Sequence, residues 1–157
     1  MDKKAFKMVF ATFVVLVAGC MALCWATEAA AGLFGWKLAD QESVEAVRRM
    51  AGWNWPFVYF IAYVAIAAPV VEETLFRCGF FTWPQPARPA RAAIVSSLAF
   101  SAVHYLFAGK PDNAFVALFF FGLVQCRLYA KTGRLWHAML THSMFNIVNL
   151  AVALTTE

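Results

Sequence analysis

The chain has 157 residues, of which 62% are hydrophobic and 14% are charged, and its formal net charge is +4. An ordinary soluble domain is less apolar and more charged, so the composition predicts an integral membrane protein. It also speaks against nucleic-acid binding, because no basic face with interleaved aromatic residues accompanies the positive charge. Each membrane crossing takes roughly 20 apolar residues, so we expect a single transmembrane domain over residues 1–157.

Five apolar stretches are long enough to cross a bilayer. They lack the alternation of barrel strands, and backbone groups in lipid must be satisfied internally, so the stretches are expected to be helices. The predicted fold is therefore an all-α membrane protein, a bundle of about five transmembrane helices. The stretches are Phe6–Ala26, Phe57–Phe81, Ala92–Ala108, Ala114–Ala130 and Leu135–Leu154.

The basic residues indicate the orientation of this bundle. They precede the first stretch and fill the connections between the second and third and between the fourth and fifth stretches. Because short cytosolic loops are enriched in Lys and Arg, these ends are expected in the cytosol, with the N-terminus inside and the C-terminus outside. The residues are Lys3, Lys4, Lys7, Arg88, Arg91, Lys131 and Arg134.

The first stretch has two interpretations. Lysines followed by an apolar run are also typical of a signal peptide, and Val17–Cys20 resembles a lipoprotein cleavage box. However, the apolar run continues past Cys20 as far as Ala26, which makes it long enough to span a membrane. We expect an uncleaved first helix, with cleavage at Cys20 as the alternative.

The connection over residues 29–54 is the one sizeable polar segment. Val44, Val47 and Met50 recur in it at helical spacing, which predicts a short helix lying on the membrane surface. Three tryptophans flank it and are placed like interfacial anchors: Trp36, Trp53 and Trp55.

The second stretch contains two adjacent acids, Glu72 and Glu73, followed by Arg77. Consecutive helical residues point about 100° apart, so the two carboxylates should have different roles. Glu73 and Arg77 are spaced i, i+4 and are expected to form an ion pair along one helix face. Glu72 then faces the bundle interior without a local counter-charge, in the position of a general base. Pro69 predicts a kink that opens space beside these acids.

The third and fifth stretches each contain a histidine that lies four residues from a second motif residue. Phe100 and His104 share one helix face, and His142 and Asn146 share another. Together with Glu72 they can converge on one polar site in the middle or cytosolic half of the membrane. His137, near the cytosolic end of its stretch, is assigned an interfacial role instead.

A carboxylate, two imidazoles and an amide suit the activation of water and the stabilisation of an oxyanion, as peptide-bond hydrolysis requires. Glu72, His104 and His142 can also be ligands of zinc, although the HExxH spacing is missing. We favour a glutamate-activated water, which requires no cofactor, over zinc. Taken singly, such residues are more often structural ion pairs and interhelical hydrogen bonds, and only their coincidence on three stretches favours catalysis.

The four cysteines lie within predicted spans and show neither a CxxC pair nor zinc-ligand spacing. They are expected to be small buried hydrophobic residues. A Cys78 thiolate assisted by His104 is a minor alternative, which an apolar environment disfavours. The cysteines are Cys20, Cys24, Cys78 and Cys126.

Three ordered motifs resemble those of the CPBP family of glutamate-type intramembrane proteases, which is related to the CAAX prenyl endopeptidases and to bacteriocin-processing and immunity membrane proteins. Glu72–Arg77 fits its EExxxR motif, Phe100–His104 fits FxxxH and His142–Asn146 fits HxxxN. The resemblance covers residues 58–149, the expected catalytic core. Two positions depart from the family pattern. Cys78 follows Arg77 where glycine is usual, and His137 stands where proline is frequent.

The resemblance implies an intramembrane endopeptidase that cuts a membrane-anchored protein, with C-terminal sorting tails and prenylated tails as candidate substrates. In this interpretation Glu72 activates water, while His104, His142 and Asn146 complete the site or stabilise the oxyanion. Supporting roles fall to Glu73, Arg77 and Phe100. The short chain and the style of its motifs indicate the cytoplasmic membrane of a prokaryote.

Two other functions remain open. The main rival is a catalytically inactive scaffold or a bacteriocin-immunity-type protein that keeps the fold and binds a partner. A proton or ion pathway built on the same acids and histidines is the third, but the sequence shows no internal repeat of the kind common in transporters.

Overall fold

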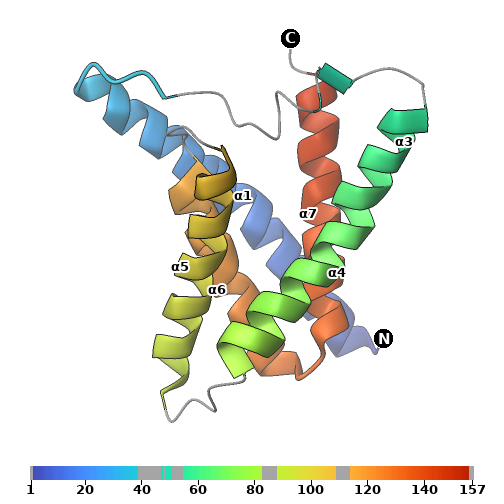
Figure 1. The fold of residues 1–157 in the computed structure, drawn as a ribbon. Helices are drawn as coiled ribbons and strands as arrows, with labels where there is room; N and C mark the ends of the chain where they lie inside the picture. Colours follow the sequence, from blue (N-terminus) through green and yellow to red (C-terminus); the bar gives the residue numbers. More distant parts are fainter. Residues whose placement is uncertain are drawn as a thin grey trace.

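The computed structural model describes residues 2–38, 47, 49–50, 55–82, 88–108 and 114–155. Its regular elements in this part of the chain are all helices, which confirms the predicted fold class (Figure 1). The helices are α1 (Lys3–Leu33), α3 (Trp55–Ala62), η1 (Tyr63–Ala67), α4 (Ala68–Glu73), η2 (Thr74–Thr82), α5 (Pro89–Ala108), α6 (Ala114–Thr132) and α7 (Leu135–Thr155).

Four helical segments are long and apolar enough to cross a membrane, namely α1, the continuous segment Trp55–Thr82, α6 and α7. The chain is therefore an integral membrane protein. The fifth predicted span, α5, is a helix of 20 residues in the same bundle. It is more polar than the others because it carries serines, and Ser96, Ser97 and Ser101 are turned inward and buried.

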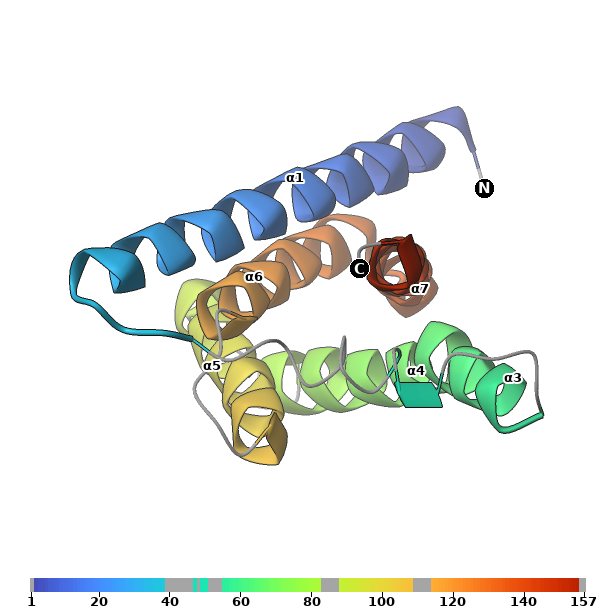
Figure 2. The ribbon, with the colours of Figure 1, turned by 90° about the horizontal axis from the view of Figure 1, so that it is seen from above.

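The helices are arranged in layers. Seen from above, α1 runs along one side, α6 and α7 lie in the middle, and α5 and the α3–α4 segment form the opposite side (Figure 2). The two chain ends lie at opposite ends of the bundle (Figure 1). This is the arrangement that an odd number of crossings requires, whereas the cytosolic location of the N-terminus stays a prediction.

The first helix is longer than predicted. Instead of ending at Ala26, α1 continues to Leu33, because the following residues include three alanines and no proline, and their one glycine, Gly32, lies in the last turn. Just after the end of the helix, Gly35 adopts a positive φ of 70°. Glycine accepts this conformation at no steric cost, so the chain can turn away here. Part of the expected outer connection is thus helical.

The second segment is bent in a way that the sequence only partly predicted. Pro69 does disturb the helix, but the disturbance takes the form of π-helical turns on both sides of α4, namely η1 and η2. π-Helical turns take up an extra residue and are frequent at functional sites. They determine which way the acids of α4 point.

A compact aromatic core holds α1, η2, α5, α6 and α7 together. Its centre is Phe100 on α5, which stacks on Phe121 and meets Phe76 edge to face. Beside it, α5 and α6 approach closely at Gly122, where an added Cβ would lie 2.8 Å from the Cβ of Ser97. Only glycine permits this approach. The buried cluster is Leu16, Cys20, Phe76, Phe100, Ala117, Phe121 and Phe145.

Of the four cysteines, Cys20 and Cys126 are buried as predicted, whereas Cys24 and Cys78 are half-buried, and all four are free thiols. Cys20 lies in the middle of α1 and donates to the carbonyl of Ala117 on α6. This contact anchors the long first helix to the bundle.

The connection before α3 is described only in part. Val47 is buried in a cluster with Leu150 and Ala153 near the end of α7, so this residue packs against the bundle. Trp36 and Trp55 are exposed, as interfacial anchors would be. Val44 and Trp53, which belong to the same predictions, lie outside the described residues.

Candidate active site

The predicted ion pair between Glu73 and Arg77 is present and fully buried. Arg77 Nε donates to Glu73 Oε2 at 2.8 Å, and Nη2 donates to Glu73 Oε1 at 3.4 Å. Both side chains are 0% exposed. The two-pronged geometry fixes the carboxylate in one orientation, which a single contact would not do.

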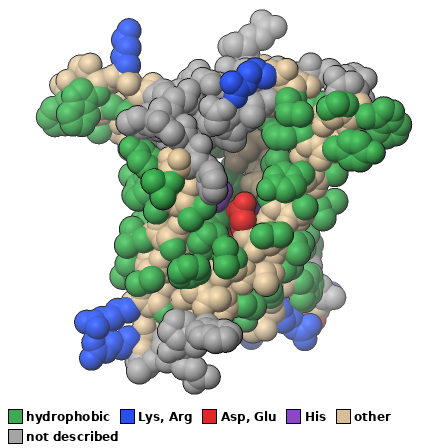
Figure 3. Space-filling model, in the orientation of Figure 1, with side chains coloured by type: hydrophobic (Ala, Val, Ile, Leu, Met, Phe, Trp, Pro, Cys, Tyr) green, Lys and Arg blue, Asp and Glu red, His purple; other side chains and the backbone are tan. Residues whose placement is uncertain are grey.

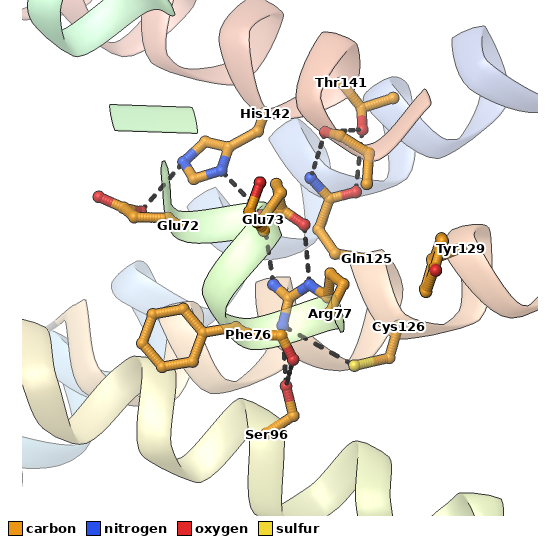
Figure 4. A network of polar contacts seen from close by, with 12 residues as sticks. Glu72, Glu73, Phe76, Arg77, Ser96, Gln125, Cys126, Tyr129, Thr141 and His142 are labelled. Atoms are coloured by element: carbon orange, nitrogen blue, oxygen red, sulfur yellow. Dashed lines mark hydrogen bonds and ion pairs between the residues drawn. The ribbon is translucent and has the colours of Figure 1, made fainter. Parts of the chain in front are cut away.

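Arg77 is itself held by the neighbouring helices. Its Nη1 donates to Ser96 Oγ on α5 at 3.2 Å and to Cys126 Sγ on α6 at 3.8 Å (Figure 4). The guanidinium also lies 5.4 Å from the centre of the Phe100 ring, within cation–π range. The charge is therefore stabilised from three helices, and the pair acts as a rigid brace inside the bundle.

The brace reaches the histidine of α7. His142 Nδ1 lies 2.9 Å from Glu73 Oε1. An ionised carboxylate only accepts hydrogen bonds, so Nδ1 carries the hydrogen and Nε2 is left as an acceptor in the neutral imidazole. That Nε2 lies 3.7 Å from Glu72 Oε2. Glu73 thus orients His142, and His142 faces Glu72.

His104 is oriented in the same sense by a different partner. Its Nδ1 lies 2.9 Å from the carbonyl oxygen of Phe100 one turn earlier on α5. A carbonyl accepts only, so here too Nδ1 carries the hydrogen. His104 Nε2 then lies 3.7 Å from Glu72 Oε2. The i, i+4 spacing of Phe100 and His104 therefore works through the backbone of Phe100 as well as through its ring.

Three acceptor atoms from three helices consequently meet at one place: Glu72 Oε2 and the Nε2 atoms of both histidines. Glu72 Oε2 is buried and has no hydrogen-bond partner within the described part of the protein. A buried acceptor without a donor is costly. The arrangement is therefore suited to a group that donates hydrogen bonds to several acceptors at once, as a water molecule does.

A carboxylate and two imidazoles are also a known catalytic zinc ligand set. Within the residues that the structure describes, however, no group of three or more His, Cys, Asp or Glu side chains is placed to hold a metal ion. A role for zinc stays a prediction from the sequence.

Asn146 was expected beside the histidines and is placed differently. Its Nδ2 donates to the backbone carbonyl of Val64 in η1 at 2.8 Å. It lies one turn after His142 on α7 but contacts the second segment above the acids. The sequence therefore placed Asn146 on the correct helix face and did not anticipate its backbone partner.

His137 was assigned an interfacial role because it lies at the start of its helix. It is instead 2% exposed and packs against the Trp136 ring, and neither ring nitrogen has a hydrogen-bond partner within the described residues. The position near the helix end is as predicted, but the side chain is buried. Cys78 lies near Tyr129, with its Sγ 3.9 Å from the hydroxyl.

Sequence reasoning missed several polar residues that support this site. Ser96 bridges Arg77 and the Phe76 carbonyl. Gln125 on α6 donates to the Ala138 carbonyl and accepts from Thr141, which links α6 to α7 behind His142 (Figure 4). Isolated Ser, Gln and Thr residues inside apolar stretches were the available signal, because such residues join helices in membranes.

Comparison with known proteins gives one result. No curated protein and no solved structure gave a significant match to the chain. A family model, described as type II CAAX prenyl endopeptidase Rce1-like, matches residues 53–148. This range is more than half of the chain and includes all three motifs. It therefore contains the buried Glu73–Arg77 pair and the three residues whose acceptor atoms meet, namely Glu72, His104 and His142. The chain therefore belongs to the Rce1-like family of type II CAAX prenyl endopeptidases.

Proposed function

We propose that this protein is a glutamic-type intramembrane endopeptidase. The observation that carries the proposal is the meeting of Glu72 Oε2 with two imidazole Nε2 atoms at 3.7 Å each. Glu72 and one imidazole can each accept a hydrogen bond from the same water molecule, which orients and polarises it. Membership of a family of endopeptidases supports the same reaction.

The reaction follows from these positions. Glu72 takes a proton from the water, and the resulting hydroxide attacks the carbonyl carbon of the scissile peptide bond to give a tetrahedral oxyanion. The protonated Glu72 then gives its proton to the leaving nitrogen, and the carbon–nitrogen bond breaks. The imidazoles, fixed by Phe100 and Glu73, present Nε2 acceptors that hold the attacking water in place. One water is consumed, Glu72 returns to its carboxylate form, and a carboxylic acid and an amine are formed.

The exposure of the site supports a substrate that lies in the membrane. Glu72 is 24% and His104 35% exposed, whereas His142 and Glu73 are buried. Acidic and histidine atoms are visible at mid-height of one face of the bundle, framed by hydrophobic side chains (Figure 3). The exposed hydrophobic residues on these helices include Val71, Leu75, Val103 and Leu106. A membrane-anchored protein with a C-terminal sorting or lipidated tail fits such an opening.

The test is cleavage of a defined substrate by the purified full chain in detergent or liposomes. A C-terminally anchored protein and a prenylated peptide are incubated with the wild type and with Glu72→Gln, and products are identified by mass spectrometry. Removing a general base should lower the rate by about 10²–10⁴-fold. Glu28→Gln is the matched control, because this exposed glutamate lies on α1, away from the site.

The outcomes separate the candidate functions. A product that forms with the wild type and with Glu28→Gln, but not with Glu72→Gln, supports proteolysis and locates the bond. A product of equal amount with Glu72→Gln would refute the role of Glu72. If the folded wild type releases no product from either substrate, the protein is better described as a binding scaffold.

A further inference from the structure

The backbone carbonyl of Val64 has lost its helical donor. In η1 the backbone N–H of Ala68 donates to the carbonyl of Tyr63, five residues earlier. The next bond of this kind would run from residue 69 to Val64, but residue 69 is proline and has no N–H. An unsatisfied carbonyl inside a membrane protein is costly, so Val64 requires a donor from elsewhere.

Asn146 supplies this donor from α7. Its Nδ2 donates to the Val64 carbonyl at 2.8 Å. Val64 also packs against the cluster that contains Leu150, so η1 is joined to α7 by both polar and apolar contacts. Because Asn146 follows His142 by one helical turn, a single face of α7 holds both η1 and the site imidazole.

The turn that is held in this way determines the direction of Glu72. Each π-helical turn takes up about one extra residue, which rotates the following residues by roughly 100° relative to an uninterrupted α-helix. With η1 in place, Glu73 points into the bundle and Glu72 Oε2 lies between the two histidines. A return of η1 to α-helical geometry would turn both carboxylates away from these partners.

We propose that Asn146 is a positioning residue. It replaces the hydrogen bond that Pro69 removes, locks the π-helical turn η1, and thereby aims Glu72 at His104 and His142. This positioning role is separate from the oxyanion role that the sequence resemblance implies, because it uses one of the two N–H donors of the Asn146 amide. The consequence for activity rests on the proposed function, whereas the hydrogen bond to Val64 does not.

A double-mutant cycle tests the proposal. Asn146→Leu keeps the branched shape of the side chain and removes its donor, and Pro69→Ala gives residue 69 an N–H that can donate to Val64. Thermal unfolding of the full chain in detergent micelles is measured for the wild type, both single variants and the double variant. Asn149→Leu is the matched control, because Asn149 is an exposed asparagine on the same helix.

We expect Asn146→Leu to lower the unfolding midpoint in the wild type and to lower it by less than half as much in the Pro69→Ala background. Asn149→Leu should have little effect in either. Equal shifts from Asn146→Leu in both backgrounds would overturn the proposal, because Asn146 would then stabilise the protein independently of Pro69.

Cleavage kinetics add a measurement that a merely structural role would not change. Misplacing a catalytic group by about 1 Å can lower the rate by up to roughly 100-fold. Asn146→Leu should therefore lower kcat with little change in KM, and Pro69→Ala should restore most of the loss. If Pro69→Ala does not relieve the loss of kcat, Asn146 acts directly on the reacting atoms and the positioning role is wrong. If the wild type cleaves nothing, the proposed function fails, and the unfolding cycle still decides the role of Asn146.

Hydrogen exchange keeps the proposal testable if the Pro69→Ala protein does not fold. In Asn146→Leu alone, peptides that contain Tyr63–Ala67 should exchange faster, while peptides from the middle of α6 should not change. Unchanged exchange in Tyr63–Ala67 would overturn the proposal, since η1 would then be stable without the amide.

Discussion

Replacing Arg77 by methionine should destabilise the protein strongly, because it leaves a buried carboxylate without its main counter-charge. Arg77 contacts Glu73 through two nitrogens, at 2.8 and 3.4 Å, and both side chains are 0% exposed. In the variant, His142 is the remaining partner of the Glu73 carboxylate. Breaking a buried ion pair from one side typically costs about 3–5 kcal/mol, and we expect a loss of this size.

The reverse substitution, Glu73→Gln, leaves the Arg77 guanidinium buried and should cost a similar amount. The double variant removes both charges together, so no uncompensated charge remains. Its loss of stability should be smaller than the sum of the two single losses by about 2 kcal/mol or more. Gln at position 73 can still accept a hydrogen bond from His142, which separates the effect of charge from that of geometry.

The assay is unfolding of the purified full chain in mixed micelles with increasing sodium dodecyl sulfate, followed by circular dichroism. Arg91→Met serves as the control for removing an exposed arginine. If the two single losses simply add in the double variant, Glu73 and Arg77 do not stabilise each other, and the description of the pair as a brace is wrong.

Two further predictions concern local structure. Gly122→Ala places a Cβ 2.8 Å from the Cβ of Ser97 and should lower the free energy of unfolding by about 1–3 kcal/mol. The control Gly32→Ala, whose Cβ would have no neighbouring atom within 4 Å, should be neutral or slightly stabilising. Equal effects of the two substitutions on stability would contradict the packing argument. The Ala5 N–H donates to Asp2 Oδ1 and thereby lowers the pKa of Asp2. The ionised Asp2 cap therefore stabilises α1 fully at pH values above the usual aspartate pKa. This stabilisation is lost as the pH falls through the lowered pKa of Asp2. As the pH falls from the usual aspartate pKa through the lowered pKa of Asp2, hydrogen exchange in the first turn of α1 should accelerate in the wild type. It should not accelerate in Asp2→Asn, because the amide oxygen of Asn caps the helix at any pH.

The sequence by itself determined the helical bundle and the acids and histidines of its polar interior, although not the Ser96, Gln125 and Thr141 side chains that support them. Long apolar runs must be helical in a membrane, and a helix brings residues four apart onto one face whatever it packs against. For this reason the Glu73–Arg77 pair, the different surroundings of the two acids and the shared face of Phe100 and His104 could all be predicted. Spacing along one helix is a local property of the backbone.

Only the tertiary structure decided which partners these side chains find on other helices. The sequence placed His142 near Glu72, but the structure also joins its Nδ1 to Glu73, and it gives Asn146 the carbonyl of Val64 as a partner. Two further features were decided at the same level: the close approach of α5 and α6 at Gly122, and the π-helical turn before Pro69. Both depend on how helices pack and rotate against one another, which no spacing within a single helix specifies.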